Sequence, residues 1–150
     1  MNRIAALVER VVRPKQKAHA HCDLPCGVYD PTEARIAAQT VFNATKKLID
    51  LDASGLEREN TSGRMVAVKE EHAQKCKEHL WVLWSDYFKP EDAEAHPELH
   101  GVIWNATKLC SAAKRGVDLE VAQKLLDAVD EIDKIFWSTP GASAAAVVQK

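Results

Sequence analysis

Four segments of this chain carry apolar residues at the spacing of an α-helix, and this pattern constrains the fold more than any other feature of the sequence. Within each segment, apolar residues recur three or four positions apart, which places them on one face of a helix. No stretch alternates apolar and polar residues as a half-buried strand would. Since short connections favour antiparallel neighbours, the sequence predicts an all-α fold, an antiparallel up-and-down four-helix bundle.

Capping and helix-breaking residues set the expected ends of these helices. Asp30 precedes Pro31, the arrangement of an N-cap residue and a proline at the first helical position. Asp118 has the same capping capacity before the last segment. The polar segment 86–96 contains a proline and is expected to be a connection. The expected helices cover residues 31–54, 61–87, 97–116 and 118–137.

Several prominent side chains are expected to have structural roles. Cys76 and Cys110 lie on the apolar stripes of two different helices, so they are predicted to be buried thiols and not metal ligands. The charged run 69–71 is predicted to be a solvated helix face. Four tryptophans are expected to be core residues or subunit contacts: Trp81, Trp84, Trp104 and Trp137.

The first 20 residues differ in charge from the rest of the chain. They hold five basic residues and one acidic residue, whereas the whole chain has a net charge of −2. The remainder is therefore acidic, which argues against nucleic-acid binding. No apolar run is long enough for a membrane span, and the run 4–8 is too short for an export signal. This indicates a cytoplasmic protein.

Ala18-His19-Ala20 has the small-x-small form of a cleavage site. Residues 1–20 are therefore expected to be a removable leader, with an organelle transit peptide or an ordinary N-terminal helix as the alternatives. The expected organisation is this leader, a metal-binding hook over 21–30, the bundle over 31–139 and a mobile tail over 140–150.

The segment directly after the candidate cleavage site concentrates metal-binding chemistry. His21, Cys22 and Cys26 place one imidazole and two thiols within six residues. Half a zinc site and a small disulfide loop are alternatives, but a second Cys/His pair at a suitable spacing for zinc is absent and a reducing compartment disfavours the disulfide. Cleavage after Ala20 would add the α-amine of His21 to the donors. Such a nitrogen and sulfur set suits Ni(II) or Cu(II), and nickel is the sharper hypothesis.

Four motifs in this order resemble the nickel-containing superoxide dismutases. They are HCDLPCGVYDP (21–31), WSDYFKP (84–90), HPELH (96–100) and IDKIFW (132–137). The resemblance implies a leader removed by a processing peptidase, a homohexamer of four-helix bundles, and a nickel ion that cycles between Ni2+ and Ni3+. The activity it implies is conversion of superoxide to oxygen and hydrogen peroxide.

The same resemblance assigns roles to residues of this chain. It implies nickel ligation by His21, Cys22 and Cys26. It places two tyrosines beside the open face of the metal and associates an aspartate and a lysine with substrate approach, which here are Tyr29, Tyr87, Asp23 and Lys89. A lysine at an entrance is physically reasonable because superoxide is an anion.

The sequence departs from the family pattern at one pair of positions. The family orients the axial imidazole with a glutamate and an arginine, and Ala37 and His72 stand at those positions here. Since such outer partners orient metal ligands, we expect His72 to hold the ring of His21 in their place. The alternative function is a nickel-binding or redox-sensing homologue with weak turnover.

Overall fold

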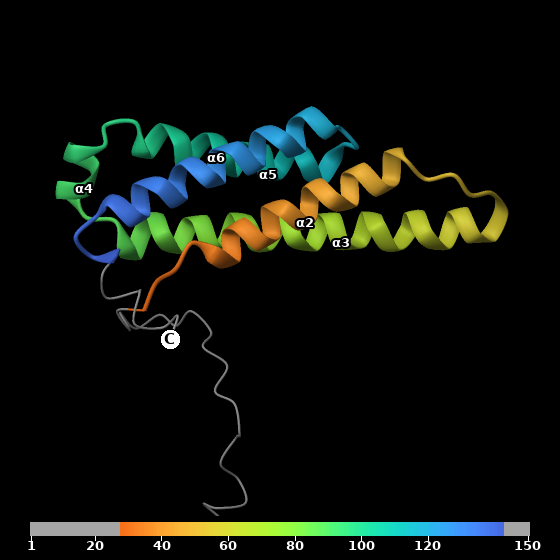
Figure 1. Ribbon diagram of the computed structural model, residues 1–150, viewed down its shortest axis with the longest axis horizontal. Coiled ribbons are helices and arrows are strands. Elements are labelled where there is room, and N and C mark those ends of the chain that lie inside the picture. Colours follow the sequence, from red (N-terminus) through yellow and green to blue (C-terminus); the bar gives the residue numbers. More distant parts are fainter. Residues whose placement is uncertain (1–27, 143–150) are drawn as a thin grey trace, which may run out of the picture.

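Four long helices form the described part of the protein, and each packs along two of the others. The computed structural model describes residues 28–142. The long helices are α2 (Thr32–Ile49), α3 (Gly55–Val82), α5 (Leu99–Arg115) and α6 (Leu119–Ser138). Helix α2 contacts α3 and α6, and α5 contacts the same two helices, so the four close into a bundle (Figure 1). The prediction of an all-α antiparallel bundle is confirmed, while the hook residues 21–27 lie outside the described residues.

The core consists of one apolar stripe from each long helix. Helix α2 contributes mainly alanines, whose small side chains allow close approach to its neighbours, whereas α6 contributes larger residues such as Leu125, Ile132 and Phe136. Fully burying a side chain of this larger kind contributes about 1.5–3 kcal/mol. Cys76 and Cys110 are also fully buried, as expected from their positions on the stripes.

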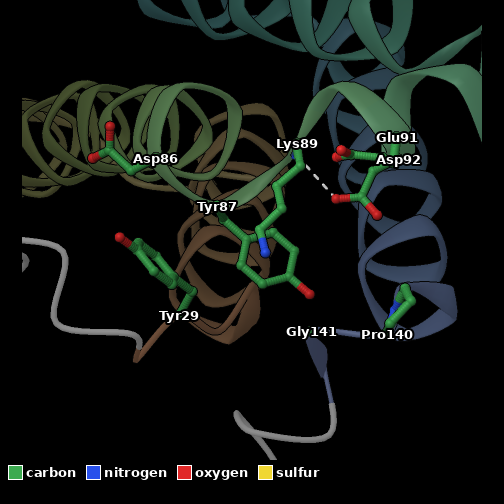
Figure 2. A pocket seen from close by; sticks show the side chains of 8 residues that line it. All are labelled: Tyr29, Asp86, Tyr87, Lys89, Glu91, Asp92, Pro140 and Gly141. Atoms are coloured by element: carbon green, nitrogen blue, oxygen red, sulfur yellow. Dashed lines mark hydrogen bonds between the residues drawn. The ribbon is translucent and has the colours of Figure 1, made fainter.

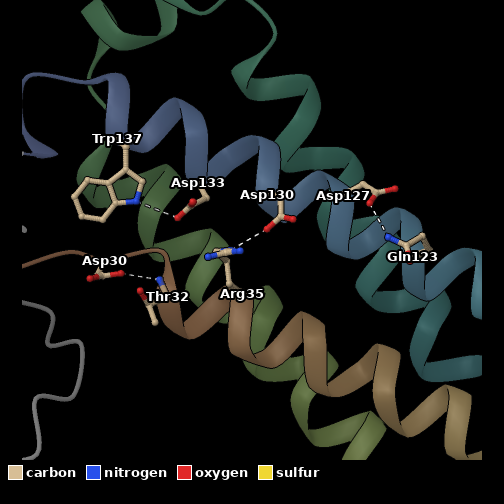
Figure 3. Close-up of polar contacts among 8 residues, drawn as sticks. All are labelled: Asp30, Thr32, Arg35, Gln123, Asp127, Asp130, Asp133 and Trp137. Carbon is tan, nitrogen blue, oxygen red and sulfur yellow. Dashed lines mark hydrogen bonds and ion pairs between the residues drawn. The ribbon is translucent and has the colours of Figure 1, made fainter. Parts of the chain in front are cut away.

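The caps of the helices agree in part with the sequence. The carboxylate of Asp118 accepts hydrogen bonds from the backbone N–H groups of Glu120 and Val121, so the predicted N-cap of the last helix is confirmed. Asp30 accepts from the N–H of Thr32 at 2.7 Å, although the N-cap position of α2 is Pro31 (Figure 3).

Three of the expected boundaries were wrong. The first is the end of α2, which lies at Ile49 and not at residue 54. Helix α3 begins at Gly55, several residues before the expected start. The sequence suggested that this glycine breaks a helix, whereas with a φ of +57° it is the first residue of α3. The first turns of α3 carry exposed residues, which is why no apolar stripe revealed them. The expected connection 86–96 contains the last two residues of a π-helical turn, η1 (Leu83–Tyr87), and the whole of a short helix, α4 (Pro90–Ala95).

Surface contacts add little to the packing of the bundle. The Nε of Arg35 on α2 lies 2.8 Å from a carboxylate oxygen of Asp130 on α6 (Figure 3). Both side chains are well exposed, and such pairs contribute at most about 1 kcal/mol.

Among the described residues, no helix is both long and apolar enough to cross a membrane.

Lys69 contradicts its expected place on a solvated face. Its side chain is only 2% exposed, and its ammonium donates hydrogen bonds to the backbone carbonyls of Ala113, Lys114 and Gly116. These carbonyls end α5 and have no partner within their own helix. Burial lowers the pKa of Lys69, but the three acceptors and the negative end of the helix dipole compensate the charge. Lys69 is therefore a cap supplied by a neighbouring helix.

Lys69→Met is expected to lower the free energy of unfolding by about 1–3 kcal/mol, because it leaves buried carbonyls without donors. Lys75→Met is the matched control, since Lys75 lies on the same helix and is half exposed; its effect is expected to stay within about 0.5 kcal/mol. Urea unfolding followed by circular dichroism measures both. Equal stabilities of the two variants would contradict the capping role.

Candidate active site at the end of the bundle

A pocket of about 450 Å³ lies at the end of the bundle where α2 begins and α6 ends. It is open to solvent, and its walls come from four separate parts of the chain. They are Tyr29 in the segment before α2, the π-helical turn after α3, the start of α4 and the turn after α6 (Figure 2). The lining residues are Tyr29, Asp86, Tyr87, Lys89, Glu91, Asp92, Pro140 and Gly141.

Tyr87 is the most tightly held of the lining residues. Its ring stacks on Phe136 of α6 with centroids 4.3 Å apart, and the ring of Tyr29 lies 5.6 Å away. Its hydroxyl forms a short hydrogen bond with the hydroxyl of Thr139. Burial raises the pKa of Tyr87, so the phenol is neutral at physiological pH. The π-helical turn aims Tyr87 at α6, since one extra residue in the turn rotates the following side chains.

Lys89 shares the lining of the pocket with three carboxylates. Its backbone N–H donates to Asp92 at 2.9 Å, an interaction that fixes the start of α4, and its side chain extends toward Tyr87 (Figure 2). Asp86 and Glu91 also line the pocket. Among the described lining residues, three are therefore acidic and Lys89 is the single basic one. An anion that approaches here meets attraction only close to Lys89.

The pocket brings together three residues that the sequence had singled out, namely Tyr29, Tyr87 and Lys89. The expected ligands and the fourth substrate-access residue lie outside the described residues, and their roles stay predictions. These are His21, Cys22, Cys26 and Asp23. The described chain begins at Val28, next to Tyr29, so the hook is covalently attached at the rim of the pocket.

His72 lies away from this pocket. It precedes Tyr87 by 15 positions, which is about 22 Å along a helix axis. Its ring is half buried, and its Nδ1 lies 2.9 Å from the carbonyl of Val68 in the same helix. Ala37 is buried in the core and contributes no polar group. The expected contact between His72 and His21 stays a prediction.

Sequence reasoning missed the wall formed by the turn after α6. Pro140 and Gly141 were expected to begin a mobile tail, whereas the structure places them in the lining of the pocket. Thr139, which the sequence analysis had not singled out, holds the hydroxyl of Tyr87. A Pro-Gly pair two residues after the IDKIFW motif was the available signal. The acidic residues Glu91 and Asp92 were missed because they fell in the expected connection.

Within residues 28–142, no group of three or more His, Cys, Asp or Glu side chains is arranged to hold a metal ion. Cys76 and Cys110 face each other inside the bundle, and this contact together with burial raises the pKa of the Cys76 thiol. A thiol that remains protonated is a poor metal ligand. The prediction that these two cysteines are structural is therefore consistent with their surroundings.

The bundle, its end pocket and a Cys/His segment that precedes Tyr29 in the sequence are the features expected of a helical metalloprotein. A family model described as nickel-containing superoxide dismutase matches residues 16–140. The chain therefore belongs to the nickel-containing superoxide dismutase family. It is an enzyme that converts superoxide to oxygen and hydrogen peroxide, and its cofactor is nickel.

Similar proteins agree over most of their length. The chain is 47% identical to a nickel superoxide dismutase of Streptomyces seoulensis over 133 residues, which are 89% of this chain and 98% of the relative. It is 44% identical to the Streptomyces coelicolor enzyme over the same length. A crystal structure of a nickel superoxide dismutase in the oxidised state has a TM-score of 0.71 at 48% identity, covering 78% of this chain and 96% of that one.

The donors that this chain offers fit nickel. One imidazole and two thiols occur together only in the hook, and thiolate with nitrogen donors is a set that Ni(II) accepts in tetragonal geometry. The oxygen donors around the pocket, by contrast, are the carboxylates that suit harder cations. His21, Cys22 and Cys26 are thus the residues that would hold the metal.

The charges around the pocket lead to a prediction about superoxide approach. Lys89→Gln should lower the second-order rate constant for superoxide by about 2-fold or more, and Glu91→Gln should raise it by about 2-fold, because each change alters one unit charge near the entrance. Both effects should shrink as ionic strength rises. Pulse radiolysis at several salt concentrations measures these rates.

Glu57→Gln is the matched control for charge alone. Glu57 is exposed in the first turn of α3, at the opposite end of the bundle (Figure 1). The second-order rate constant of the Glu57→Gln variant for superoxide should equal that of the unmodified enzyme. If Lys89→Gln also behaved like this control, Lys89 would have no role in guiding the substrate.

Proposed function

We propose that this chain is the precursor of a nickel superoxide dismutase whose metal site forms when a peptidase removes residues 1–20. Cleavage there exposes the α-amine of His21 beside its imidazole and the Cys22 and Cys26 thiols. The observation that carries the proposal is the attachment of this hook to the rim of a pocket lined by Tyr29, Tyr87 and Lys89. When bound, nickel supplies one-electron exchange with superoxide.

The residues of the pocket are proposed to guide superoxide. Tyr29 and Tyr87 form one wall of the pocket, with their ring centroids 5.6 Å apart. Lys89 attracts the superoxide anion over the last few ångströms, against the surrounding carboxylates. Asp23 is proposed to act beside Tyr29 in substrate approach, on the basis of the family motif in which it lies.

We further propose that the enzyme is a cytoplasmic homohexamer. The support is a set of large apolar side chains that the single chain leaves exposed, since such side chains often mark protein contacts. None of the four tryptophans is a core residue, so the alternative of a subunit contact remains for them. The exposed fractions are 44% for Trp81, 46% for Trp84, 63% for Trp104 and 39% for Trp137.

The processing step can be tested with two versions of the protein, the full chain and a chain that begins at His21. The shorter chain should bind about one nickel per subunit and be active, whereas the full chain should do neither, because an amide replaces the free amine.

Cys22→Ser and Cys26→Ser in the shorter chain should abolish activity with little change in helical content. Metal analysis, dismutation assays and circular dichroism measure these properties.

Cys110→Ala in the shorter chain is the matched control for loss of a thiol, since Cys110 is buried between helices and outside the hook. It should keep its nickel and its activity per nickel. Full nickel occupancy and activity in a chain that still begins at Met1 would overturn the proposal.

His72 is proposed to orient the imidazole of His21, a role that the family pattern suggests although His72 lies about 22 Å along the helix axis from Tyr87 within one chain. The support is its tautomer: the carbonyl of Val68 can only accept, so Nδ1 carries the proton and Nε2 of the neutral ring is left as an acceptor. An acceptor is what the N–H of a metal-bound imidazole requires, and the family uses a glutamate for this purpose.

His72→Ala should leave nickel binding largely intact and lower activity per bound nickel by about 10-fold or more, the scale of such losses around metal ligands. His79→Ala is the control, because His79 is a half-buried histidine of the same helix. Nickel content, melting temperature and dismutation are measured on one preparation. A lower melting temperature with unchanged activity per nickel would mean that His72 only packs in the bundle.

A further inference from the structure

The turn that follows α6 encloses the hydroxyl end of Tyr87. The backbone N–H of Ala142 donates to the carbonyl of Thr139 at 3.2 Å, which closes the turn over Pro140 and Gly141. Thr139 is 7% exposed and Ala142 is 4% exposed, so both ends of the turn are packed against the bundle. The turn is therefore a fixed wall of the pocket.

The direction of the hydrogen bond between Thr139 and Tyr87 follows from the partners of Thr139. Its hydroxyl donates to the carbonyl of Phe136 at 2.8 Å, and a carbonyl can only accept. A threonine hydroxyl has one proton, so toward Tyr87 its oxygen can only accept. The proton of the Tyr87 hydroxyl consequently points to Thr139, and the phenol presents lone pairs to its remaining surroundings.

Gly141 limits the movement of the same hydroxyl. A Cβ atom at this position would lie 3.1 Å from the Tyr87 oxygen and 3.4 Å from its ring, so the bare backbone is in close contact with the end of the phenol. Figure 2 shows the hydroxyl of Tyr87 pointing toward this turn, whereas that of Tyr29 points to the other side. Stacking on Phe136 fixes the ring itself.

We infer that Thr139 is a positioning residue for the reaction, which binds the hydroxyl proton of Tyr87 and thereby makes Tyr87 a hydrogen-bond acceptor, not a proton donor, toward the pocket. The inference rests on the proposed role of Tyr87 at the substrate entrance. Its chemical consequence is that the protons used to form hydrogen peroxide come from solvent or from other groups. Thr139 acts through Tyr87 and does not itself line the pocket.

The test uses the nickel-loaded chain that begins at His21, with Thr139→Val, Thr139→Ser, Tyr87→Phe and the double variant Thr139→Val with Tyr87→Phe. Thr139→Val keeps the shape of the side chain and removes the hydroxyl, whereas Thr139→Ser restores it. Activity per bound nickel should fall in Thr139→Val by about 2- to 10-fold, as for loss of one net hydrogen bond. Thr139→Ser should recover it, and the double variant should be no worse than Tyr87→Phe alone.

A spectroscopic measurement reports the hydrogen bond directly. The chain has two tyrosines, so in a Tyr29→Phe background the C–O stretching band in ultraviolet resonance Raman spectra belongs to Tyr87. That band should shift on Thr139→Val and return on Thr139→Ser, which a purely structural role of Thr139 as a helix end would not require.

The outcomes separate the inference from the proposed function. If Tyr87→Phe lowers activity per nickel but Thr139→Val changes neither activity nor the band, the positioning role is wrong and the role of Tyr87 stands. If Thr139→Val lowers activity equally with and without the Tyr87 hydroxyl, Thr139 does not act through Tyr87. If Tyr87→Phe leaves activity per nickel unchanged, the proposed role of Tyr87 is wrong, and the inference is overturned with it.

Discussion

The mutual burial of four apolar helix faces is the constraint on which the rest of the structure depends. No single helix here can shield its own stripe, so α2, α3, α5 and α6 must pack together, with α2 made thin by its alanines. This packing brings the start of α2 and the ends of α3 and α6 to the same end of the bundle (Figure 1). Tyr29, Tyr87 and the turn after α6 meet there as a consequence, although they are far apart in the sequence.

The separate roles proposed for the hook and the bundle follow from that arrangement. The proposed metal-binding donors belong to a short segment with little capacity to form a core, whereas Tyr87 is fixed by the bundle through its stack on Phe136. In the proposed precursor, the ligands would therefore be completed by cleavage without refolding of the bundle. The acidic surroundings of Lys89 limit electrostatic attraction of superoxide to the immediate entrance.

The sequence was sufficient for the bundle, because helical periodicity directly reports which faces are buried. It failed where burial does not follow polarity: Lys69 is buried because the carbonyls at the end of α5 need donors, and no local pattern contains that information. The sequence was also insufficient at Gly55, where a glycine with a positive φ is the first residue of a helix. In the site, Tyr29, Tyr87 and Lys89 were identified from motifs, but Thr139 and Gly141 act through a tertiary contact with Tyr87 that spacing alone cannot reveal.

The central claim is that the hook holds nickel beside the wall formed by Tyr29 and Tyr87. The most direct measurement is a crystal structure of the nickel-loaded chain that begins at His21, with anomalous diffraction collected on both sides of the nickel absorption edge. The account predicts one nickel peak per subunit, bonded to His21, Cys22 and Cys26 and next to the rings of the two tyrosines. A nickel peak bound to other side chains, or a hook that holds the metal away from this end of the bundle, would contradict it.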